Sequence, residues 1–133
     1  MTDRSGYRLA RDGDELRAEV PVRLANRRAD RVFLPLCSMP ALQWRNGDRW
    51  MDVPMSIPVC LALGSVPLEP GTERLVSGQV LLSPSRLDGS IGSSGDEYRL
   101  VFELHDERGV PGGQAAGLLP VEQRVTNSFR LTW

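Results

Sequence analysis

The sequence predicts an all-β domain, built as a sandwich of two antiparallel sheets from about eight short strands. Three observations predict this fold class. Apolar residues recur at every second position in several segments, Gly- and Pro-rich turn signals separate those segments, and no amphipathic segment has the length of a helix. Many short strands joined by turns are typical of two sheets that pack face to face, so we expect one apolar core between them.

The segment 96–104 has the clearest alternation and is the predicted central strand. One of its faces carries the side chains of Tyr98, Leu100, Phe102 and Leu104. The segment contains neither Pro nor Gly, and loop-like sequence bounds it on both sides. Because successive side chains of a strand point to opposite faces, this pattern predicts a strand with one face in the core.

The chain before residue 37 predicts a leader and three strands. We expect residues 1–6 to be a flexible N-terminal leader and residues 7–133 to be a single domain. A short strand over residues 7–11 precedes the longest alternation of the chain, residues 16–24, and an apolar strand follows over residues 32–37. Pro21 has no N–H to donate to a neighbouring strand, so it predicts a sheet edge or a bulge.

Residues 41–53 predict a β-hairpin around Asn46-Gly47-Asp48, because Asn-Gly supplies the positive φ angles of tight hairpin turns. With a three-residue loop, Trp44 and Trp50 face each other across the two strands. Trp44 lies on the face of Leu42, so we expect it to be buried. Trp50 alternates with acidic residues, so we expect it to be the more exposed tryptophan.

The rest of the chain alternates between predicted strands and loops. Gly78 predicts a bulge, and the Ser- and Gly-rich residues 83–95 predict a mobile loop. The expected elements are a short strand at 59–61, a turn at 67–71, a strand at 74–82, the loop at 83–95, the central strand, a second long loop at 106–120 and a last strand segment within 121–133.

Cys37 and Cys60 are the two cysteines of the chain. We interpret them as one disulfide, which implies an oxidising compartment: the periplasm, the cell surface or the outside. The alternatives are two buried free thiols, or a thiol that works in catalysis or metal binding. A metal site would need further ligands, and His105 is the sole histidine. We therefore expect no metal, no cofactor and no catalytic residue.

Length and charge exclude several classes of function. A chain of 133 residues fits one domain of common size. The net charge is −1 and all 16 basic residues are arginine, so nothing attracts the whole chain to nucleic acid or to an anionic membrane. The pair Arg27-Arg28 is too short for a nucleic-acid patch. The sequence contains no run of about 18 apolar residues, so it predicts no transmembrane helix.

Several short motifs together carry a family resemblance. They are residues 20–26, 33–37, 46–50, Cys60, 68–71, 96–100 and 127–129. In this order they resemble the immunoglobulin-like and fibronectin-type-III-like β-sandwich domains of bacterial cell-envelope and secreted proteins. The resemblance implies that the hydroxyl of Tyr98 bonds upstream backbone at a corner of the sandwich. It also implies a non-catalytic module that binds, spaces or supports.

Three functional hypotheses follow. The first is a protein-interaction or structural module of a bacterial envelope or secreted protein, lipoproteins included, that binds through the end loops 26–30 and 106–120. There Arg27, Arg28 and Arg108 would meet an acidic partner. The second is carbohydrate binding through exposed tryptophan, with Trp50 as the platform and Trp44 as a further candidate. The third, a Cys–His hydrolase, requires a free thiol and a partner for His105.

Overall fold

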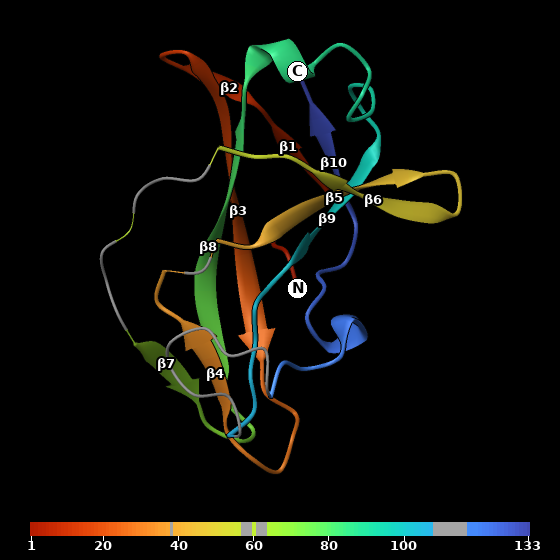
Figure 1. The fold of residues 1–133 in the computed structure, drawn as a ribbon. Helices are drawn as coiled ribbons and strands as arrows, with labels where there is room; N and C mark the ends of the chain where they lie inside the picture. Colours follow the sequence, from red (N-terminus) through yellow and green to blue (C-terminus); the bar gives the residue numbers. More distant parts are fainter. Residues whose placement is uncertain (38, 57–59, 61–63, 108–116) are drawn as a thin grey trace.

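The computed structural model describes residues 1–37, 39–56, 60, 64–107 and 117–133 (Figure 1). The strands of this part of the chain form three sheets. Their strand orders are β1-β10-β9-β5-β6, β2-β3-β8 and β4-β7. The strands are β1 (Gly6–Arg8), β2 (Ala10–Asp12), β3 (Glu15–Ala25), β4 (Val32–Pro35), β5 (Ala41–Asn46), β6 (Arg49–Val53), β7 (Ser65–Leu68), β8 (Glu73–Leu82), β9 (Glu97–Val101) and β10 (Phe129–Thr132). Neighbours are antiparallel except β1 and β10, which are parallel.

The predicted all-β class is confirmed, although these residues form ten strands in three sheets where about eight in two were expected. The described helical segments are two short 3-10 turns, η1 (Pro84–Arg86) and η2 (Val121–Gln123). No helix among the described residues is both long and apolar enough to cross a membrane. The immunoglobulin-like topology stays a prediction.

The predicted central strand is confirmed as β9, which has β10 on one side and β5 on the other. Its alternation sets its burial, since Tyr98 and Leu100 are fully buried. The ladder ends at Val101, but the same face continues into the core through Phe102 and Leu104. The following chain is held by other bonds; the Phe102 N–H donates to the carbonyl of Arg124 over 2.8 Å.

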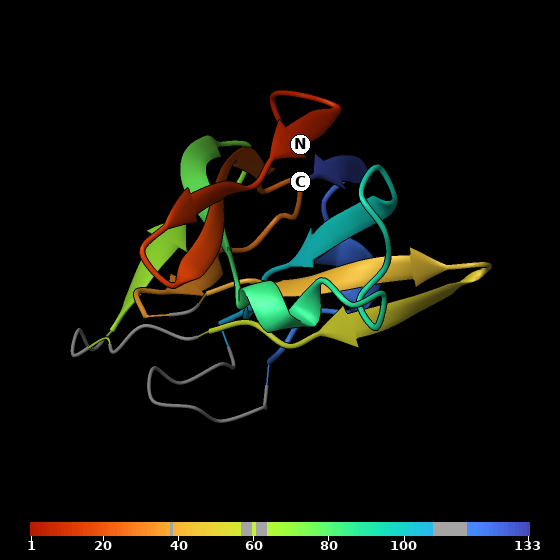
Figure 2. The same cartoon turned by 90° about the horizontal axis from the view of Figure 1, so that it is seen from above.

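The buried faces of the sheets meet in one core. The longest antiparallel pair, β3 and β8, covers one side of it, and the five-stranded sheet covers the other (Figure 2). The core side chains below 2% exposure are Val20, Val22, Val80, Leu82, Leu42, Tyr98, Leu100, Phe129 and Leu131. They come from both layers, as expected when each strand turns one apolar face inward.

The register of β3 and β8 explains two residues that sequence reasoning had marked. It runs without interruption from Leu16 opposite Leu82 to Ala25 opposite Glu73, so the expected bulge at Gly78 is absent from this ladder. Gly78 instead allows close packing, because a Cβ there would lie 2.5 Å from a methyl carbon of Leu100. The missing N–H of Pro21 faces away from β8, as the N–H of Arg23 does, and the strand tolerates it there.

The hairpin of β5 and β6 is confirmed, but its loop is shorter than the three residues considered. Asn46 pairs with Arg49, which leaves Gly47 and Asp48 as a two-residue loop. Only Gly47 has a positive φ, 68°, which is the pattern of a type II′ turn.

This shorter loop changes the register of the two tryptophans. Trp44 lies opposite Met51, and Trp50 lies opposite Arg45. The two indoles therefore occupy opposite faces of the hairpin instead of facing each other. Both are half-buried, and Trp44 packs against the core. The prediction of burial is thus met in part for Trp44, and Trp50 is less exposed than expected.

The N-terminal segment differs from the expected leader and single first strand. Residues 7–11 are divided between β1 and β2, which belong to different sheets. Residues 1–6 are tied to the domain: Thr2 is buried and its N–H donates to Asn127, while Met1 accepts a hydrogen bond from the N–H of Arg23.

Three other segments also differ from the sequence-based expectation. The turn expected at 67–71 begins inside β7, where Pro67 lies opposite Phe33. The strand expected at 59–61 falls outside the described residues except for Cys60, which is in no strand. The loop at 83–95 contains η1, and its Ile91 is buried in the core, so part of this loop is packed.

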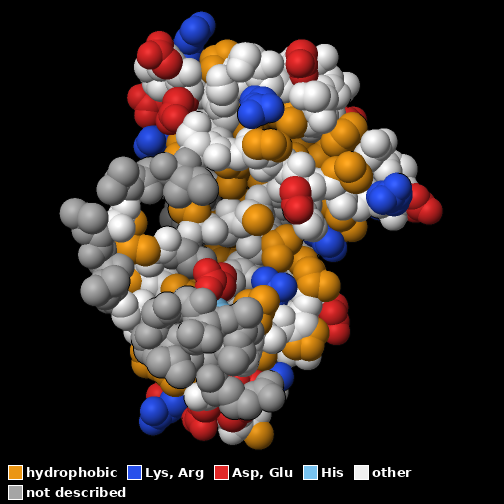
Figure 3. All heavy atoms as spheres, viewed as in Figure 1, with side chains coloured by type: hydrophobic (Ala, Val, Ile, Leu, Met, Phe, Trp, Pro, Cys, Tyr) orange, Lys and Arg blue, Asp and Glu red, His pale blue; other side chains and the backbone are white. Residues whose placement is uncertain are grey.

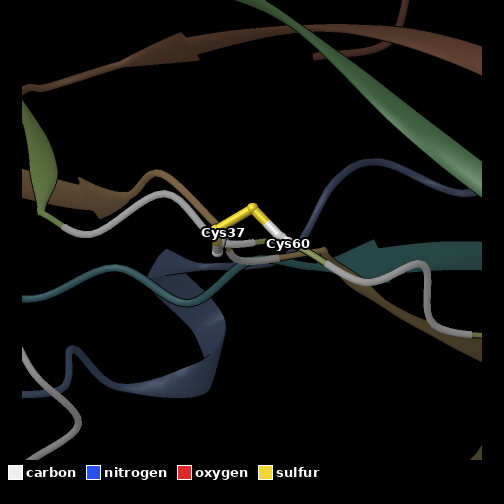
Figure 4. Close-up of a disulfide and its surroundings, with 2 residues drawn as sticks. All are labelled: Cys37 and Cys60. Carbon is white, nitrogen blue, oxygen red and sulfur yellow. A yellow bond between two sulfur atoms is a disulfide. The ribbon is translucent and has the colours of Figure 1, made fainter.

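Cys37 and Cys60 form the predicted disulfide (Figure 4). Their Cα atoms lie 5.6 Å apart, and the bridge joins the chain just after β4 to the connection between β6 and β7. Because both sulfurs are used, the hypotheses that need a free thiol are contradicted. Both cysteines are exposed, so the expected alternative of buried thiols is wrong as well.

Candidate functional site

A cavity of about 490 Å³ lies at the end of the domain where β3 runs into the 26–30 turn. Its floor consists of buried apolar side chains: Val22, Val32, Leu68, Phe102, Leu104 and Leu119. Its rim carries Arg23, Arg27, Arg28 and Arg124. This is the end of the molecule opposite η1, at the bottom of Figure 1.

Asn26 gives the turn beside the cavity its shape. The side-chain amide is buried and donates to the carbonyls of Asp30 and Leu68, each over 2.8 Å. Its oxygen accepts the N–H of Arg28 over 3.0 Å, an arrangement typical of Asx turns. The backbone of Asn26 is paired with Thr72 and Gly71. One buried amide thus fixes the turn against the neighbouring 68–72 turn and places residues 27 and 28 at the rim.

The four rim arginines have different partners. Arg28 donates to Asp30 and to Gln123 of η2, both over 3.1 Å, and so connects the turn to the C-terminal segment. Arg23 pairs with Glu73 over 3.4 Å. These carboxylates lie outside the lining of the cavity.

Arg124 and Arg27 have no acidic partner among the described residues. Arg124 donates to the carbonyls of Leu119 (2.7 Å) and Phe102 (3.0 Å), which holds the C-terminal segment against the floor. Arg27 is exposed, and its guanidinium makes no hydrogen bond or ion pair with a described residue. Among the rim arginines, Arg27 therefore has the guanidinium that protein acceptors occupy least, and it is the one most available to an incoming anion.

The cavity carries an excess of positive charge in a chain whose net charge is −1. Among the described residues, four arginines and no Asp or Glu line it. A second cavity of about 420 Å³ beside the turn end of the β5–β6 hairpin shows the contrast. There Arg45 and Arg130 are matched by Asp96 and Glu97. Figure 3 shows one face of the molecule. On the part of that face drawn in colour, basic, acidic and apolar side chains are interspersed and form no broad basic patch.

The structure brings together two of the four predicted binding residues. Arg27 and Arg28 both line the 490 Å³ cavity. Arg108 lies outside the described residues, as does most of the loop at 106–120 that was expected to join them. Trp50 lies on β6, away from the cavity.

Trp50 belongs to a polar network on the outer face of β9, β5 and β6. The guanidinium carbon of Arg99 lies 4.3 Å from the centre of its ring, in a cation–π contact. Arg99 donates to Gln43 over 2.8 Å, and Gln43 donates to Asp52 over 3.0 Å. Partial burial lowers the pKa of the Arg99 guanidinium. The Arg99 side chain thus covers one face of the indole, and that face is not open to a sugar ring. Sugar binding at Trp50 stays a prediction.

His105 anchors backbone in the structure. It exchanges two backbone hydrogen bonds with Phe33 (2.8 and 3.0 Å), and its Nε2 lies 2.9 Å from a Glu103 oxygen. The residue is only 8% exposed. It therefore lies inside the fold at the start of the second long loop.

Sequence reasoning missed Arg23, Arg124 and the apolar floor. Arg23 belongs to the outward face of an alternating strand, and such residues are normally solvated. Arg124 ends η2, and its carbonyl accepts the N–H of Phe102, which brings it to the cavity; no local pattern indicates this long-range pairing. Asn26 at the end of an alternating strand, followed by two arginines, was the one available signal. No family model, curated protein or solved structure matches this chain.

Proposed function

We propose that this chain is a non-catalytic binding module with an immunoglobulin-like β-sandwich architecture, and that it binds a protein partner through the end that contains the 26–30 turn. The cavity of about 490 Å³ carries the proposal, because its described lining combines an apolar floor with four arginines and no carboxylate. Pockets that bind ligands are typically apolar concavities with a few placed polar groups, and this cavity has that composition. The bond from the Tyr98 hydroxyl to the Ile91 carbonyl supports the immunoglobulin-like assignment.

The proposed place of action is an oxidising compartment such as the periplasm, the cell surface or the outside. The Cys37–Cys60 disulfide supports this location, because such bonds persist where thiols are not kept reduced. The resemblance to bacterial envelope domains supports a bacterial envelope or secreted protein. A module of this kind would present its arginine-lined end to a partner while the sheets serve as the scaffold.

The test is a selection of random twelve-residue peptides, displayed on phage so that their carboxy-termini are free, against the immobilised chain. We expect families of peptides that carry a negative charge beside an apolar residue, and we expect Arg27→Glu to abolish their binding. Arg86→Glu is the matched control, since Arg86 is also exposed and lies on η1 at the opposite end. Both variants should unfold at the same urea concentration as the original chain.

Two outcomes would count against the proposal. Enrichment no greater than on an unrelated immobilised protein would show that the chain does not select peptides. Enriched peptides that bind equally well to Arg27→Glu would show that another surface is used. Amide chemical shifts of the chain titrated with a selected peptide give an independent check, because changes should concentrate in residues 22–28 and 121–126.

A further inference from the structure

The size and floor of the 490 Å³ cavity suit one apolar group of a ligand. Its volume lies within the roughly 300–1,000 Å³ range of small-ligand pockets. The six floor side chains, which are one each from β3, β4 and β7 together with Phe102, Leu104 and Leu119, are all less than 9% exposed. An aliphatic or aromatic side chain placed there would lose its hydration without desolvating a charged floor group.

The rim suits one carboxylate beside that apolar group. Arg23 and Arg28 are balanced by Glu73 and Asp30, so the uncompensated charges are those of Arg27 and Arg124. A guanidinium presents its donors as a planar fork that matches a carboxylate with two parallel hydrogen bonds. Arg27 has its whole fork available, since no described residue accepts from it. A single anionic group close to an apolar one therefore complements the cavity.

The neighbouring strand edge favours an extended peptide over a lipid as the carrier of these groups. The N–H of Arg23 donates to Met1 and that of Asn26 donates to Thr72, on opposite sides of the strand. Because these directions alternate, Ala25 points its N–H and C=O to the side of Met1, away from β8. Ala25 is exposed and lines the cavity, and no described residue takes these two groups. They can pair with the backbone of an added peptide.

We propose that this cavity recognises the carboxy-terminal end of a partner polypeptide. The last apolar side chain enters the cavity, the terminal α-carboxylate meets the guanidinium of Arg27, and the extended backbone pairs with Ala25. This inference rests on the proposed function, protein binding at this end of the domain, and specifies which part of the partner is bound. Internal segments of a partner lack the α-carboxylate, so the two statements can be tested separately.

The test measures fluorescence anisotropy of labelled hexapeptides with a Gly-Ser body and a terminal leucine or phenylalanine, each as the free acid and as the amide. We expect the free acids to bind, and the amides to bind at least about tenfold more weakly, because a charge-assisted pair to arginine is lost. Arg27→Gln should weaken the free acids by a similar factor and leave the amides unchanged. Arg86→Gln should change neither.

Further probes give the outcomes that would overturn the inference. A free acid ending in serine should bind more weakly than one ending in leucine; equal binding would show that the apolar floor is not used. Binding of dodecanoate that depends on Arg27, without binding of any peptide acid, would assign the cavity to a lipid. Amides that bind as well as acids, while phage-selected peptides still require Arg27, would overturn the terminal recognition but retain protein binding. If phage selection also enriches nothing, both proposals fail.

Discussion

The hydroxyl of Tyr98 donates a hydrogen bond to the carbonyl of Ile91, seven residues upstream, over 2.8 Å. Both residues are buried, Tyr98 in the central strand β9 and Ile91 in the loop before it. The bond closes that loop over the edge of the core, so a segment rich in Ser and Gly becomes part of the packed structure. The loop also contributes Asp96, which accepts a hydrogen bond from the Trp44 indole over 3.1 Å.

Tyr98→Phe should lower the free energy of unfolding by about 1–3 kcal/mol, because the carbonyl of Ile91 would be left buried without its donor. The ring itself is retained, so no cavity forms. Urea unfolding followed by tryptophan fluorescence measures the change. Tyr7→Phe is the comparison, since that hydroxyl bonds Asp3 near the surface and its loss should cost less. An equal or smaller loss for Tyr98→Phe would contradict a structural role for this bond.

The stability of the chain should fall as the pH rises above about 10. Burial raises the pKa of Tyr98, and burial followed by the hydrogen bond to Asp3 raises that of Tyr7. Since the folded pKa values are raised, their stabilisation is complete below the unfolded pKa of about 10. It is lost as the pH rises toward the folded values, because the unfolded chain releases these protons first.

This alkaline effect can be measured cleanly because the sequence contains no lysine and two tyrosines, and both cysteines are bridged. Between about pH 10 and 11 each tyrosine should reduce the free energy of unfolding by up to about 1.4 kcal/mol per pH unit. Urea unfolding at several pH values gives the slope, and Tyr98→Phe should make it shallower. A free energy that stays constant across this interval would contradict the raised pKa values.

The strands with a strict period of two could be predicted from the sequence. Alternation around Val20 and around Leu100 defined the buried faces of β3 and β9, because a strand with one apolar side has one way to lie against a core. The strand β7 was missed because Pro67 and the Pro-Gly pair that follows favour a turn, whereas Pro67 is accommodated in a two-stranded sheet. Pairing partners such as the parallel β1 and β10 depend on contacts across the whole chain.

The candidate site could be predicted only in part, for a similar reason. Arg27 and Arg28 follow an alternating strand and so were placed at an end of the domain. The cavity itself exists because residues from widely separated parts of the chain converge there, and Arg124 comes from a segment without a regular pattern. Local sequence also left the hairpin register open, since a loop of two or three residues decides whether Trp44 and Trp50 share a face.

Gly78→Ala should destabilise the fold by about 1–3 kcal/mol, since an added Cβ would lie 2.5 Å from the Cδ1 of Leu100 and 3.2 Å from the carbonyl oxygen of Val20. The neighbours are a fully buried side chain and a backbone atom of the paired strand, so little relief is available. Gly6→Ala is the matched control in a strand, because its nearest neighbour, the Arg130 oxygen, is 3.7 Å away. Equal urea midpoints for the two variants would contradict this explanation of Gly78.

The disulfide should stabilise the fold through the segment that it closes. Cys37 and Cys60 are 23 positions apart, and the whole β5–β6 hairpin lies between them. Bridging them restricts the unfolded chain, which in the chain-entropy model contributes about 3 kcal/mol. Replacing both cysteines with alanine should therefore lower the free energy of unfolding by about that amount, measured in urea without reductant.

Reduction of the original chain supplies the control for this variant. Both cysteines are exposed, so a small thiol reagent can reach the bridge in the folded protein. With reductant present the original chain should unfold near the urea midpoint of the double alanine variant, and the variant should not respond to reductant at all. If the oxidised original and the variant unfold together, the bridge contributes nothing to stability. In that case the hairpin is held by its pairing with β9 alone.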